Sequence, residues 1–383
     1  MTAATTAIRG TEHVPFVNLA RQIERLRPDL ISAFEAVLDS RAFIKGAHTA
    51  AFETAFAQAL SVPHAVGCSN GTTALALALE AAGIGPGDEV IVPTLTFIAT
   101  AEAVCHVGAT PVFCDVDPDS FTISPDDLLR HLTPRTRAVI PVHLYGTPAN
   151  MDAILSIADD KRLVVIEDCA QAHLATHRGQ MVGTLGNAGT FSFFPGKNLG
   201  ALGDAGMVTT TSPELAAAVA KLADHGRVSK YEHDQIGYNN RLDGLQAAFL
   251  SVKLPHLAEW TERRRHIARY YDQRLRPAGV RTIVPPANSA PVYHLYVIGV
   301  EDRSAVAAHL AAAGVETGVH YPIPLHLQPA FRGMQGMGPL PNAEWAAAHL
   351  LSLPICGEIT DSEAAFVCDC VLDAISMVSR RVG

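Results

Sequence analysis

The chain has 383 residues, 48% of them hydrophobic, and a formal net charge of −9 without a long basic run. This composition supports large buried cores and leaves room for two domains, with no reason to expect extensive disorder. Duplex nucleic acid is not an expected partner, because binding to phosphates needs clustered Lys and Arg.

The first half of the chain alternates strands and helices. After a leader at residues 1–13, apolar residues at helical spacing predict a helix over Arg21–Leu38. Later helices are expected to start near Thr72, Phe97, Pro125 and Met151. The apolar runs between them predict the strands Ala65–Cys68, Glu89–Pro93, Thr110–Cys114, Ala138–Val142 and Leu163–Asp168. This βαβα order indicates an α/β fold with a mostly parallel sheet covered by helices on both faces.

The second half adds strands and longer helices. The expected strands are Thr190–Phe194, Gly206–Thr210 and Val292–Val300. The expected helices are Pro213–Ala223, Leu242–Lys253, His256–Arg276, Ser304–Ala313 and Asp361–Val378. A composition shift around 255–290 predicts a boundary between a large domain, 14–255, and a small C-terminal domain, 256–383.

Cysteine usage and the N-terminus bear on the compartment. Seven Cys are scattered along the chain, and several lie in apolar stretches where Cys acts as a small buried hydrophobe. Cys368 and Cys370 form a CxC pair, but no second pair has zinc-site spacing, so no metal site is predicted. An odd count without a disulfide framework suggests a reducing compartment. No secretory segment or bilayer-length apolar run is present, so we expect a cytoplasmic protein without a membrane partner.

Ser69-Asn70-Gly71-Thr72-Thr73 lies where a strand meets a helix. Gly71 allows a tight turn, and Thr72 and Thr73 offer N–H groups and hydroxyls at the helix N-terminus. Such a site favours a phosphate dianion. Taken alone, these residues fit the commoner alternative, an ordinary N-cap, better.

Three more residues stand at strand ends or turns. Asp168 ends a buried strand, where a carboxylate needs a cationic partner such as a protonated pyridine nitrogen. Lys197 follows Phe, Pro and Gly, a setting that can tune an amine for attack on a carbonyl. Phe97 can stack on a flat ring. Taken singly, each residue has an ordinary structural explanation: Asp168 as a capping residue, Lys197 as a surface charge and Phe97 as a core residue. Together with the phosphate turn they have the order of a pyridoxal-phosphate site.

The chain resembles the DegT/DnrJ/EryC1/StrS family of sugar aminotransferases, a branch of the fold-type I aspartate aminotransferase superfamily. The resemblance runs from Val14 to the C-terminal helix. It rests on GIGPGDEVIVPTLTFIATAEAV (83–104), GATPVFCDVDPDSFTI (108–123), PVHLYGTPANMDAI (141–154), VIEDCAQAH (165–173), FSFFPGKNLGALGDAG (191–206) and NNRLDGLQAAFLSVKL (239–254). It implies a seven-stranded, mostly parallel sheet in a large cofactor domain, with a smaller α+β domain after it.

The resemblance also implies roles around a pyridoxal 5′-phosphate cofactor. Lys197 forms the covalent Schiff base, and Asp168 pairs with the pyridine nitrogen. Phe97 stacks on the ring, and Gln171 lies beside the ring and its phenolic oxygen.

Further implied roles concern the cofactor phosphate and a second subunit. Gly71, Thr72, Thr73 and Ser192 form the phosphate side of the site. Asn239 is expected to reach the phosphate of the neighbouring subunit, which implies a homodimer with shared active sites.

Substrate contacts are expected from loops over the cofactor. His320 and Tyr321, followed by His326 in the same Pro-rich segment, suit a rigid polar wall, although a tight solvated connection explains them too. Tyr145 is expected to line the sugar pocket, and its neighbour His143 is either a pocket residue or a buried core residue. Arg241 either pairs with a substrate anion or is structural.

Two departures from the family pattern are visible. The family commonly reads Gly-Asp-Gly-Gly where this chain has Ala205 in the third position, and Thr73 stands where Asp or Ala is frequent. Neither change removes a catalytic group.

The implied reaction moves an amino group from L-glutamate to a nucleotide-linked keto-sugar, with pyridoxamine phosphate as the intermediate form of the cofactor. The HLYG and PGKNLG segments most resemble members acting on dTDP-3-keto-6-deoxyhexoses. A 4-keto sugar nucleotide or another cyclic ketone is the alternative substrate. Less favoured alternatives are a sugar dehydratase, which is associated with His in place of Lys197, and a non-catalytic regulatory homologue.

Overall fold

The computed structural model describes residues 13–333 and 338–382, so most of the leader at 1–13 lies outside the described residues. Its centre is a seven-stranded sheet in the order β1-β9-β8-β5-β4-β2-β3. The strands are β1 (His64–Cys68), β2 (Glu89–Pro93), β3 (Thr110–Cys114), β4 (Thr136–Val139), β5 (Val164–Asp168), β8 (Ala188–Ser192) and β9 (Gly206–Thr210). Only β9 runs antiparallel to its neighbours in this sheet. The predicted seven-stranded, mostly parallel sheet is confirmed.

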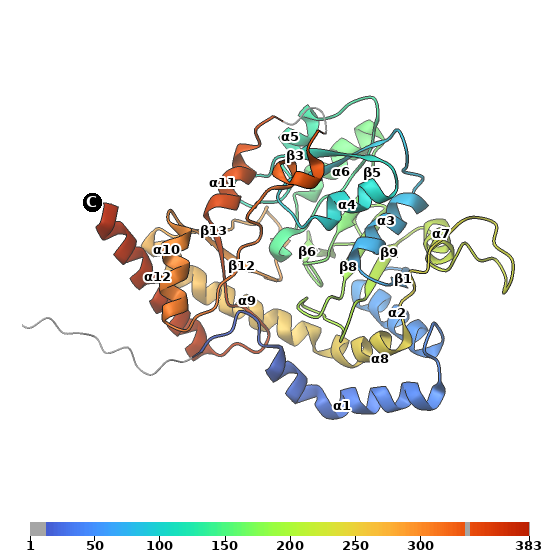
Figure 1. Cartoon of the computed structure of the whole chain (residues 1–383), viewed down its shortest axis with the longest axis horizontal. Coiled ribbons are helices and arrows are strands. Elements are labelled where there is room, and N and C mark those ends of the chain that lie inside the picture. The colour runs from blue at the N-terminus through green and yellow to red at the C-terminus, as the bar shows by residue number, and fades with distance from the viewer. Residues whose placement is uncertain (1–12, 334–337, 383) are drawn as a thin grey trace, which may run out of the picture.

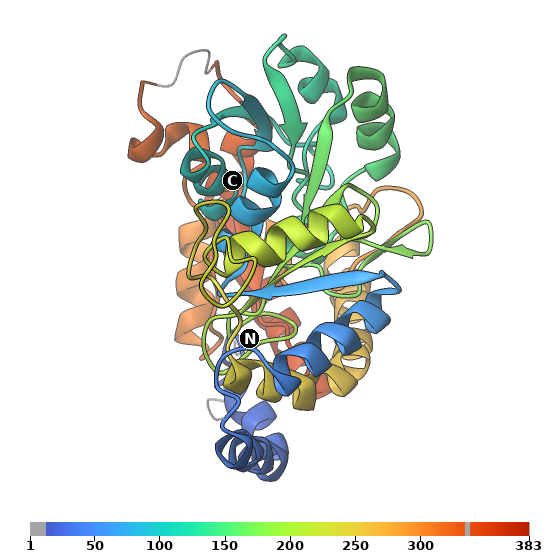
Figure 2. The ribbon, with the colours of Figure 1, turned by 90° about the vertical axis from the view of Figure 1, so that its right-hand side faces the viewer.

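Helices cover both faces of this sheet because its strands bury alternate side chains on opposite sides. Within β2, Val90 and Val92 join the core under one group of helices, whereas Ile91 joins the core on the other face. The first group is α3 (Gly71–Ala81), α4 (Ala99–His106) and α7 (Pro213–Ala223). The other face carries α2 (Ala47–Leu60), α5 (Pro125–Arg130), α6 (Met151–Lys161) and α8 (Gly244–Lys253). Figure 2 shows α7 and α2 on opposite sides of the β1 edge.

The C-terminal part packs beside this body around α9 (Leu257–Leu275), as Figure 1 shows. It contains a three-stranded sheet of β10 (Arg281–Thr282), β12 (Tyr296–Gly299) and β13 (Leu350–Leu353). Its other helices are α10 (Arg303–Ala312), α11 (Pro341–His349) and α12 (Asp361–Val382). Val14 bridges to Val315 and belongs to the same core. The division into domains at 255/256 stays a prediction.

The remaining elements are short or peripheral. α1 (Leu19–Ser40) lies along the outside of the molecule and contacts α8. A small sheet joins β6 (Thr176–His177), β7 (Gln180–Met181) and β11 (Ser289–Ala290). The 3₁₀ turns are η1 (Leu144–Gly146), η2 (Leu254–His256), η3 (Arg276–Ala278), η4 (Leu325–Leu327) and η5 (Pro329–Phe331).

Most predicted bounds differ from the structure by one to three residues at an end. A larger difference concerns Val292–Val300, where only Tyr296–Gly299 is strand. The first residues of that run are bonded elsewhere, since the Val292 N–H donates to the Gly146 carbonyl at 3.0 Å. The helix Ala47–Leu60 was not predicted from the sequence, because its many Ala residues give a weak amphipathic pattern.

Candidate active site

Lys197 stands in a compact turn that follows β8. Its N–H donates to the Phe194 carbonyl at 2.8 Å, and the Ala201 N–H donates to the Phe193 carbonyl at 2.8 Å. A Cβ on Gly200 would lie 2.2 Å from the Pro195 carbonyl oxygen, so only glycine fits there. The turn therefore has one closed shape, which fixes where the Lys197 side chain begins.

The amine of Lys197 is tuned toward its neutral form. Burial lowers its pKa from 10.5 to about 8, against the opposing effect of the Asp168 carboxylate. More of this amine is therefore unprotonated near neutral pH than of an exposed lysine, and the unprotonated amine is the nucleophile.

Asp168 ends β5 with its carboxylate buried, 6% exposed. Thr100 donates a hydrogen bond to its Oδ2 at 2.9 Å, and the Ala170 N–H donates to its Oδ1 at 3.1 Å. Burial raises the pKa of this carboxyl, while those two hydrogen bonds and the charge of Lys197 lower it. Such a carboxylate suits a buried cationic partner. Sequence reasoning missed Thr100, whose only signal is a hydroxyl three residues after Phe97.

The N-terminus of α3 forms a small anion cradle. The Gly71 and Thr72 N–H groups have no acceptor within the described ranges, as expected in a first helical turn. A Cβ on Gly71 would lie 2.6 Å from the Ser192 Cβ, so Ser192 closes the other side. These groups suit a phosphate. Thr73 differs, because its hydroxyl completes a capping box with Asn70.

An aromatic side chain faces this region from the loop after β2. Phe97 is 53% exposed, and its ring centroid lies 5.8 Å from that of Tyr321 at a 40° tilt. Gln171 donates to the Tyr321 hydroxyl at 3.3 Å and accepts from the Tyr145 N–H at 2.6 Å. Burial and then Asp168 raise the pKa of Tyr321. The fold therefore brings Phe97, Gln171 and Tyr321 together near Asp168.

The Pro-rich segment contributes unequally to this site. Burial, then the charge of Lys197, lowers the pKa of His320 to about 4, and its Nδ1 bonds to Ser352 at 2.8 Å. His326 is buried and uses both ring nitrogens, one with Thr94 at 2.7 Å and one with Glu344 at 3.2 Å. These bonds attach the segment to the body of the protein.

Tyr145 is fully buried under the same segment. Its hydroxyl donates to the His320 carbonyl. In this structure Tyr145 supports the loop and presents no free polar atom to a ligand.

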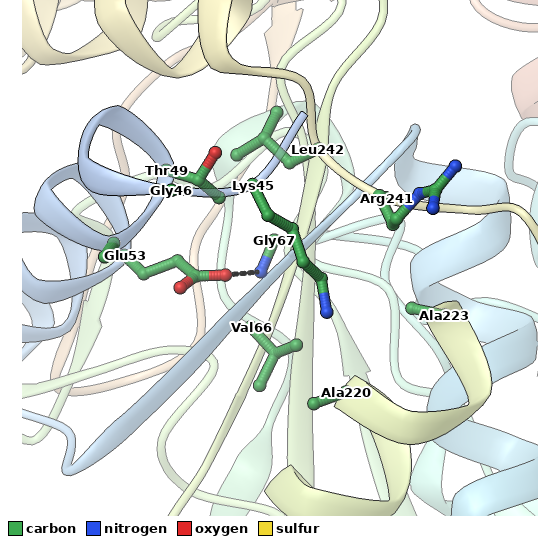
Figure 3. Close-up of a pocket in the computed structure, with 11 residues that line it drawn as sticks. Lys45, Gly46, Thr49, Glu53, Val66, Gly67, Ala220, Ala223, Arg241 and Leu242 are labelled. Carbon is green, nitrogen blue, oxygen red and sulfur yellow. Dashed lines mark hydrogen bonds between the residues drawn. The ribbon is translucent and has the colours of Figure 1, made fainter. Parts of the chain in front are cut away.

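Asn239 and Arg241 lie in a segment that runs beside the end of β1, where the Asn240 carbonyl accepts from the Ser69 N–H at 3.1 Å. Arg241 donates to Asn239 and to Asp224, the latter at 3.0 Å, and Lys45 reaches the other Asp224 oxygen at 3.0 Å. Arg241 and Lys45 line a separate pocket between α2 and α7, where Glu53 accepts from the Gly67 N–H (Figure 3). The pairing with Asp224 favours the structural alternative for Arg241 within one chain.

Glu167 is a buried carboxylate that sequence reasoning missed. It accepts from the N–H groups of Gly183, Leu185 and Gly186, each at 2.8 Å. His143 donates to it from Nε2 at 3.0 Å, because His143 Nδ1 accepts from the Ala149 N–H. His143 is thus the buried core residue of the two alternatives. A Glu between Ile166 and Asp168 in an apolar strand was the available signal.

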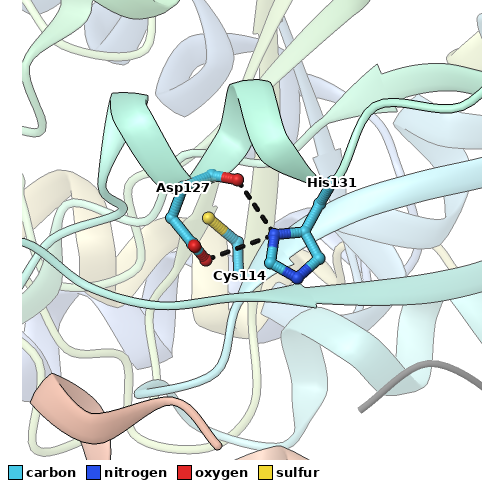
Figure 4. A group of neighbouring side chains, drawn as sticks. All are labelled: Cys114, Asp127 and His131. Atoms are coloured by element: carbon cyan, nitrogen blue, oxygen red, sulfur yellow. Dashed lines mark hydrogen bonds and ion pairs between the residues drawn. The ribbon is translucent and has the colours of Figure 1, made fainter. Parts of the chain in front are cut away.

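Cys114, Asp127 and His131 lie close together at the end of β3, as Figure 4 shows. Asp127 accepts from the Asp115 N–H at 2.6 Å and from Arg130 at 2.7 Å. His131 Nδ1 lies 2.9 Å from the Asp127 carbonyl oxygen. Burial raises the pKa of the Cys114 thiol well above its usual value, which disfavours the thiolate that binds metals. The three side chains form a hydrogen-bonded support for α5.

Several proteins of known name are similar to this chain over nearly its whole length. A protein of Streptomyces venezuelae named dTDP-3-amino-3,4,6-trideoxy-alpha-D-glucose transaminase is 44% identical over 372 residues, 97% of this chain and 98% of that protein. A UDP-N-acetyl-3-dehydro-alpha-D-glucosamine 3-aminotransferase of Acidithiobacillus ferrooxidans is 46% identical over 352 residues, 92% and 95% of the two chains. A Geobacillus stearothermophilus protein named pleiotropic regulatory protein is 45% identical over 359 residues, 93% and 96% of the two chains.

Solved structures show the same fold. S. venezuelae DesV in complex with a ketimine intermediate superposes with a TM-score of 0.92 at 44% identity, covering 95% of this chain and 98% of that one. Bacillus subtilis NtdA, solved with bound cofactor PMP, superposes with a TM-score of 0.90 at 31% identity, covering 96% and 86%.

The fold and the site define a pyridoxal-phosphate-dependent aminotransferase of fold-type I. Residues 24–372 match the DegT/DnrJ/EryC1/StrS aminotransferase family, and the chain belongs to that family.

No helix in the described part of the chain is long and apolar enough to cross a membrane.

Proposed function

We propose that the enzyme transfers an amino group from L-glutamate to a nucleotide-linked 3-keto sugar, with pyridoxal phosphate held covalently on Lys197. The observation that carries this proposal is the Lys197 amine, whose pKa burial lowers to about 8 in a turn near the buried Asp168. A lysine in this state attacks a carbonyl readily, and the carboxylate offers a partner for a cationic ring.

The residues present fit the cofactor. Gly71, Thr72 and Ser192 suit its phosphate, and Phe97 suits one face of its ring. Gln171 lies beside Tyr321, where it can meet the phenolic oxygen. When bound, the cofactor supplies an electron sink for the bond broken at the donor α-carbon.

The chain's own residues then have defined tasks. Lys197 Nζ would hold the cofactor and, once the donor amine has displaced it, would act as the base that takes the proton from the donor α-carbon. Asp168 would pair with the pyridine nitrogen and favour its protonated form. His320, whose pKa is lowered to about 4, is a weak base, which leaves Lys197 as the stronger base in this region.

The sugar assignment rests on two lines of support. The HLYG and PGKNLG segments resemble members that act on dTDP-3-keto-6-deoxyhexoses. The names of the Streptomyces and Acidithiobacillus relatives both place the amino group at C3, one on a dTDP-sugar and one on a UDP-sugar. A dTDP-3-keto-6-deoxyhexose is the substrate we propose, with His320 and Tyr321 on the sugar side of the ring.

A homodimer is part of the proposal. Several apolar side chains are exposed on α1 and just after it, namely Ile31, Phe34, Leu38, Phe43 and Ile44. The segment before Asn239 also exposes Val228, Tyr231 and Ile236. An exposed apolar area of this kind marks a protein interface. The family resemblance implies that Asn239 of one copy reaches the phosphate site of the other.

The covalent step is tested by mixing the protein with pyridoxal phosphate and borohydride and mapping the modified residue by mass spectrometry. We expect the pyridoxyl group on Lys197. An unmodified Lys197 would overturn the proposal.

The substrate is tested by offering nucleotide keto-sugars to the pyridoxamine form and following the return of the aldehyde absorbance. We expect return with a dTDP-3-keto-6-deoxyhexose. Return only with a 4-keto sugar, a keto-inositol or a keto-acid would replace the substrate class. A protein that binds the cofactor but converts nothing would support a regulatory role, the function named for the Geobacillus relative.

A further inference from the structure

Lys253 is a buried lysine outside the groups discussed so far. It ends α8, is 1% exposed and donates from Nζ to the Gly200 carbonyl at 2.8 Å. Within the described residues it forms no ion pair, and this carbonyl is the only acceptor of its amine. Burial alone lowers its pKa to about 8.

Stability does not explain a charged group at this position. A buried ammonium without a carboxylate partner costs folding free energy, and a hydrocarbon side chain of similar length would fill the same space without that cost. What distinguishes lysine here is its hydrogen bond to the Gly200 carbonyl.

Gly200 belongs to the closed turn that carries Lys197. The turn leaves Gly200 no room for a side chain because the Pro195 carbonyl lies against it. A displacement of the Gly200 carbonyl therefore moves the backbone on both sides of Lys197. The Lys253 amine fixes the position of that carbonyl through its hydrogen bond.

α8 holds the turn at a second point. The Gln246 Oε1 accepts from the Leu202 N–H at 2.9 Å. Gln246 and Lys253 are seven residues apart, which places them on one face of the helix, two turns from each other.

The other side of the turn is held by the C-terminal part. Asn198 donates to the Val292 carbonyl at 3.3 Å, and its Oδ1 lies 3.2 Å from His294 Nδ1. The turn is thus held from both sides, and among the described contacts of Gln246, Asn198 and Lys253 only that of Lys253 comes from a charged group.

We propose that Lys253 is a positioning residue for Lys197: it fixes the turn through Gly200 so that the Lys197 amine stays buried and aimed at the cofactor carbonyl. This inference rests on the proposed role of Lys197. It assigns Lys253 no contact with cofactor or substrate.

The test compares the full-length wild-type protein with Lys253→Met, which keeps the side-chain length and removes the donor and the charge. Lys221→Met is the matched control, since Lys221 pairs with Asp234 on the surface of α7. Three quantities are measured: the pH profile of Lys197 acylation in the cofactor-free protein, amide hydrogen exchange over residues 193–206, and the rate of cofactor conversion by L-glutamate.

In Lys253→Met we expect faster exchange in that peptide and a Lys197 labelling midpoint at higher pH than in the wild type, because a loosened turn lets water reach the amine. We expect the glutamate half-reaction to slow about tenfold to a hundredfold, the usual effect of a small misplacement of a reacting group. The melting temperature should not fall, and Lys221→Met should match the wild type in all three quantities.

A lower melting temperature with an unchanged labelling midpoint and unchanged half-reaction would reduce Lys253 to a structural residue and overturn the proposal. If Lys253→Met does not fold, Lys253→Gln carries the same expectations, since it also removes the ammonium. Failure of this inference is separable from failure of the proposed function. If the wild-type protein gains no pyridoxyl group on Lys197, the proposed function is wrong. If the wild type is labelled normally but Lys253→Met behaves like it in all three quantities, only the inference about Lys253 is wrong.

Discussion

The Thr100 hydroxyl donates to Oδ2 of Asp168 at 2.9 Å, a contact between the helix that follows Phe97 and the end of β5. It acts against burial, which raises the pKa of the Asp168 carboxyl. The bond therefore favours the ionised form that a protonated pyridine nitrogen requires.

Replacing Thr100 by Val keeps the shape and removes the donor. We expect the pKa of Asp168 to rise further and the glutamate half-reaction to slow about tenfold to a hundredfold, the equivalent of losing a hydrogen bond to a charged group. Stopped-flow absorbance of the cofactor measures the rate. Thr122→Val, a buried threonine bonded to Ser120, is the control and should leave the rate unchanged. Equal effects of the two variants would contradict the role of Thr100.

The charge of Asp168 also acts on Lys197, and the sign of this effect can be tested. The carboxylate raises the pKa of Lys197, while burial lowers it to about 8. In Asp168→Asn the opposing charge is lost, so the pKa of Lys197 should fall below 8. Amine labelling of the cofactor-free protein should then reach its plateau at a lower pH than in the wild type. A midpoint that moves upward would contradict the assigned sign of the Asp168 effect.

Gly71 is expected to limit the size of the phosphate cradle. In Gly71→Ala the new Cβ would meet the Ser192 Cβ at 2.6 Å, so one of the two must move. We expect pyridoxal phosphate to bind about tenfold more weakly, the loss of roughly one hydrogen bond to a charged group. Pyridoxal without phosphate should bind equally to both proteins in a fluorescence titration. Gly85→Ala, where the nearest atom lies at 3.7 Å, is the matched control. An equal loss for pyridoxal would place the damage elsewhere.

The periodic part of the fold could be predicted from the sequence, because apolar strands between helices have a strong local signature. Glu89–Pro93, Thr110–Cys114 and Gly206–Thr210 have the predicted bounds. The helix Ala47–Leu60 and the strand Leu350–Leu353 could not, since the first has little amphipathic contrast and the second is a short run whose partner lies far away in the chain.

Lys197, Asp168, Phe97 and the Gly71–Thr73 turn could be proposed from local sequence because they stand at strand ends and turns with unusual neighbours, whereas Gln171, Ser192 and Asn239 came from the family resemblance. The residues that support these side chains could not be predicted. Thr100, Glu167 and Lys253 act through contacts that join distant segments, such as Lys253 with Gly200, and no local spacing encodes such pairs. His326 was expected to contact the substrate because it lies in the Pro-rich segment with His320 and Tyr321, but in this structure both of its ring nitrogens have partners inside the protein.

Glu167 should matter for stability. Its carboxylate is fully buried and receives three backbone N–H groups and His143. In Glu167→Gln one of the two acceptor oxygens becomes an NH2 group, which cannot accept the hydrogen bonds that this oxygen received. We therefore expect a loss of about 3 kcal/mol in the free energy of unfolding. Chemical denaturation measures the loss. Glu262→Gln on the exposed side of α9 should change stability by less than about 0.5 kcal/mol. A Glu167 variant as stable as this control would contradict the anchoring role.

The proposed sharing of active sites predicts complementation between two inactive variants. Lys197→Ala removes the amine, and Asn239→Ala removes the group expected to cross to the other subunit. In a mixed dimer one site lacks both residues and the other has both. If the subunits exchange freely, half of the dimers are mixed and half of their sites are intact, so activity should return to about a quarter of the wild-type value. Activity is followed with glutamate and the sugar nucleotide after mixing equal amounts of the two proteins.

Phe34→Glu, which charges the exposed apolar face of α1, should prevent this recovery by blocking the dimer. If activity still returns when both variants also carry Phe34→Glu, the dimer interface does not include this face of α1. If activity does not return although mixed dimers have formed, Asn239 acts in the active site of its own chain.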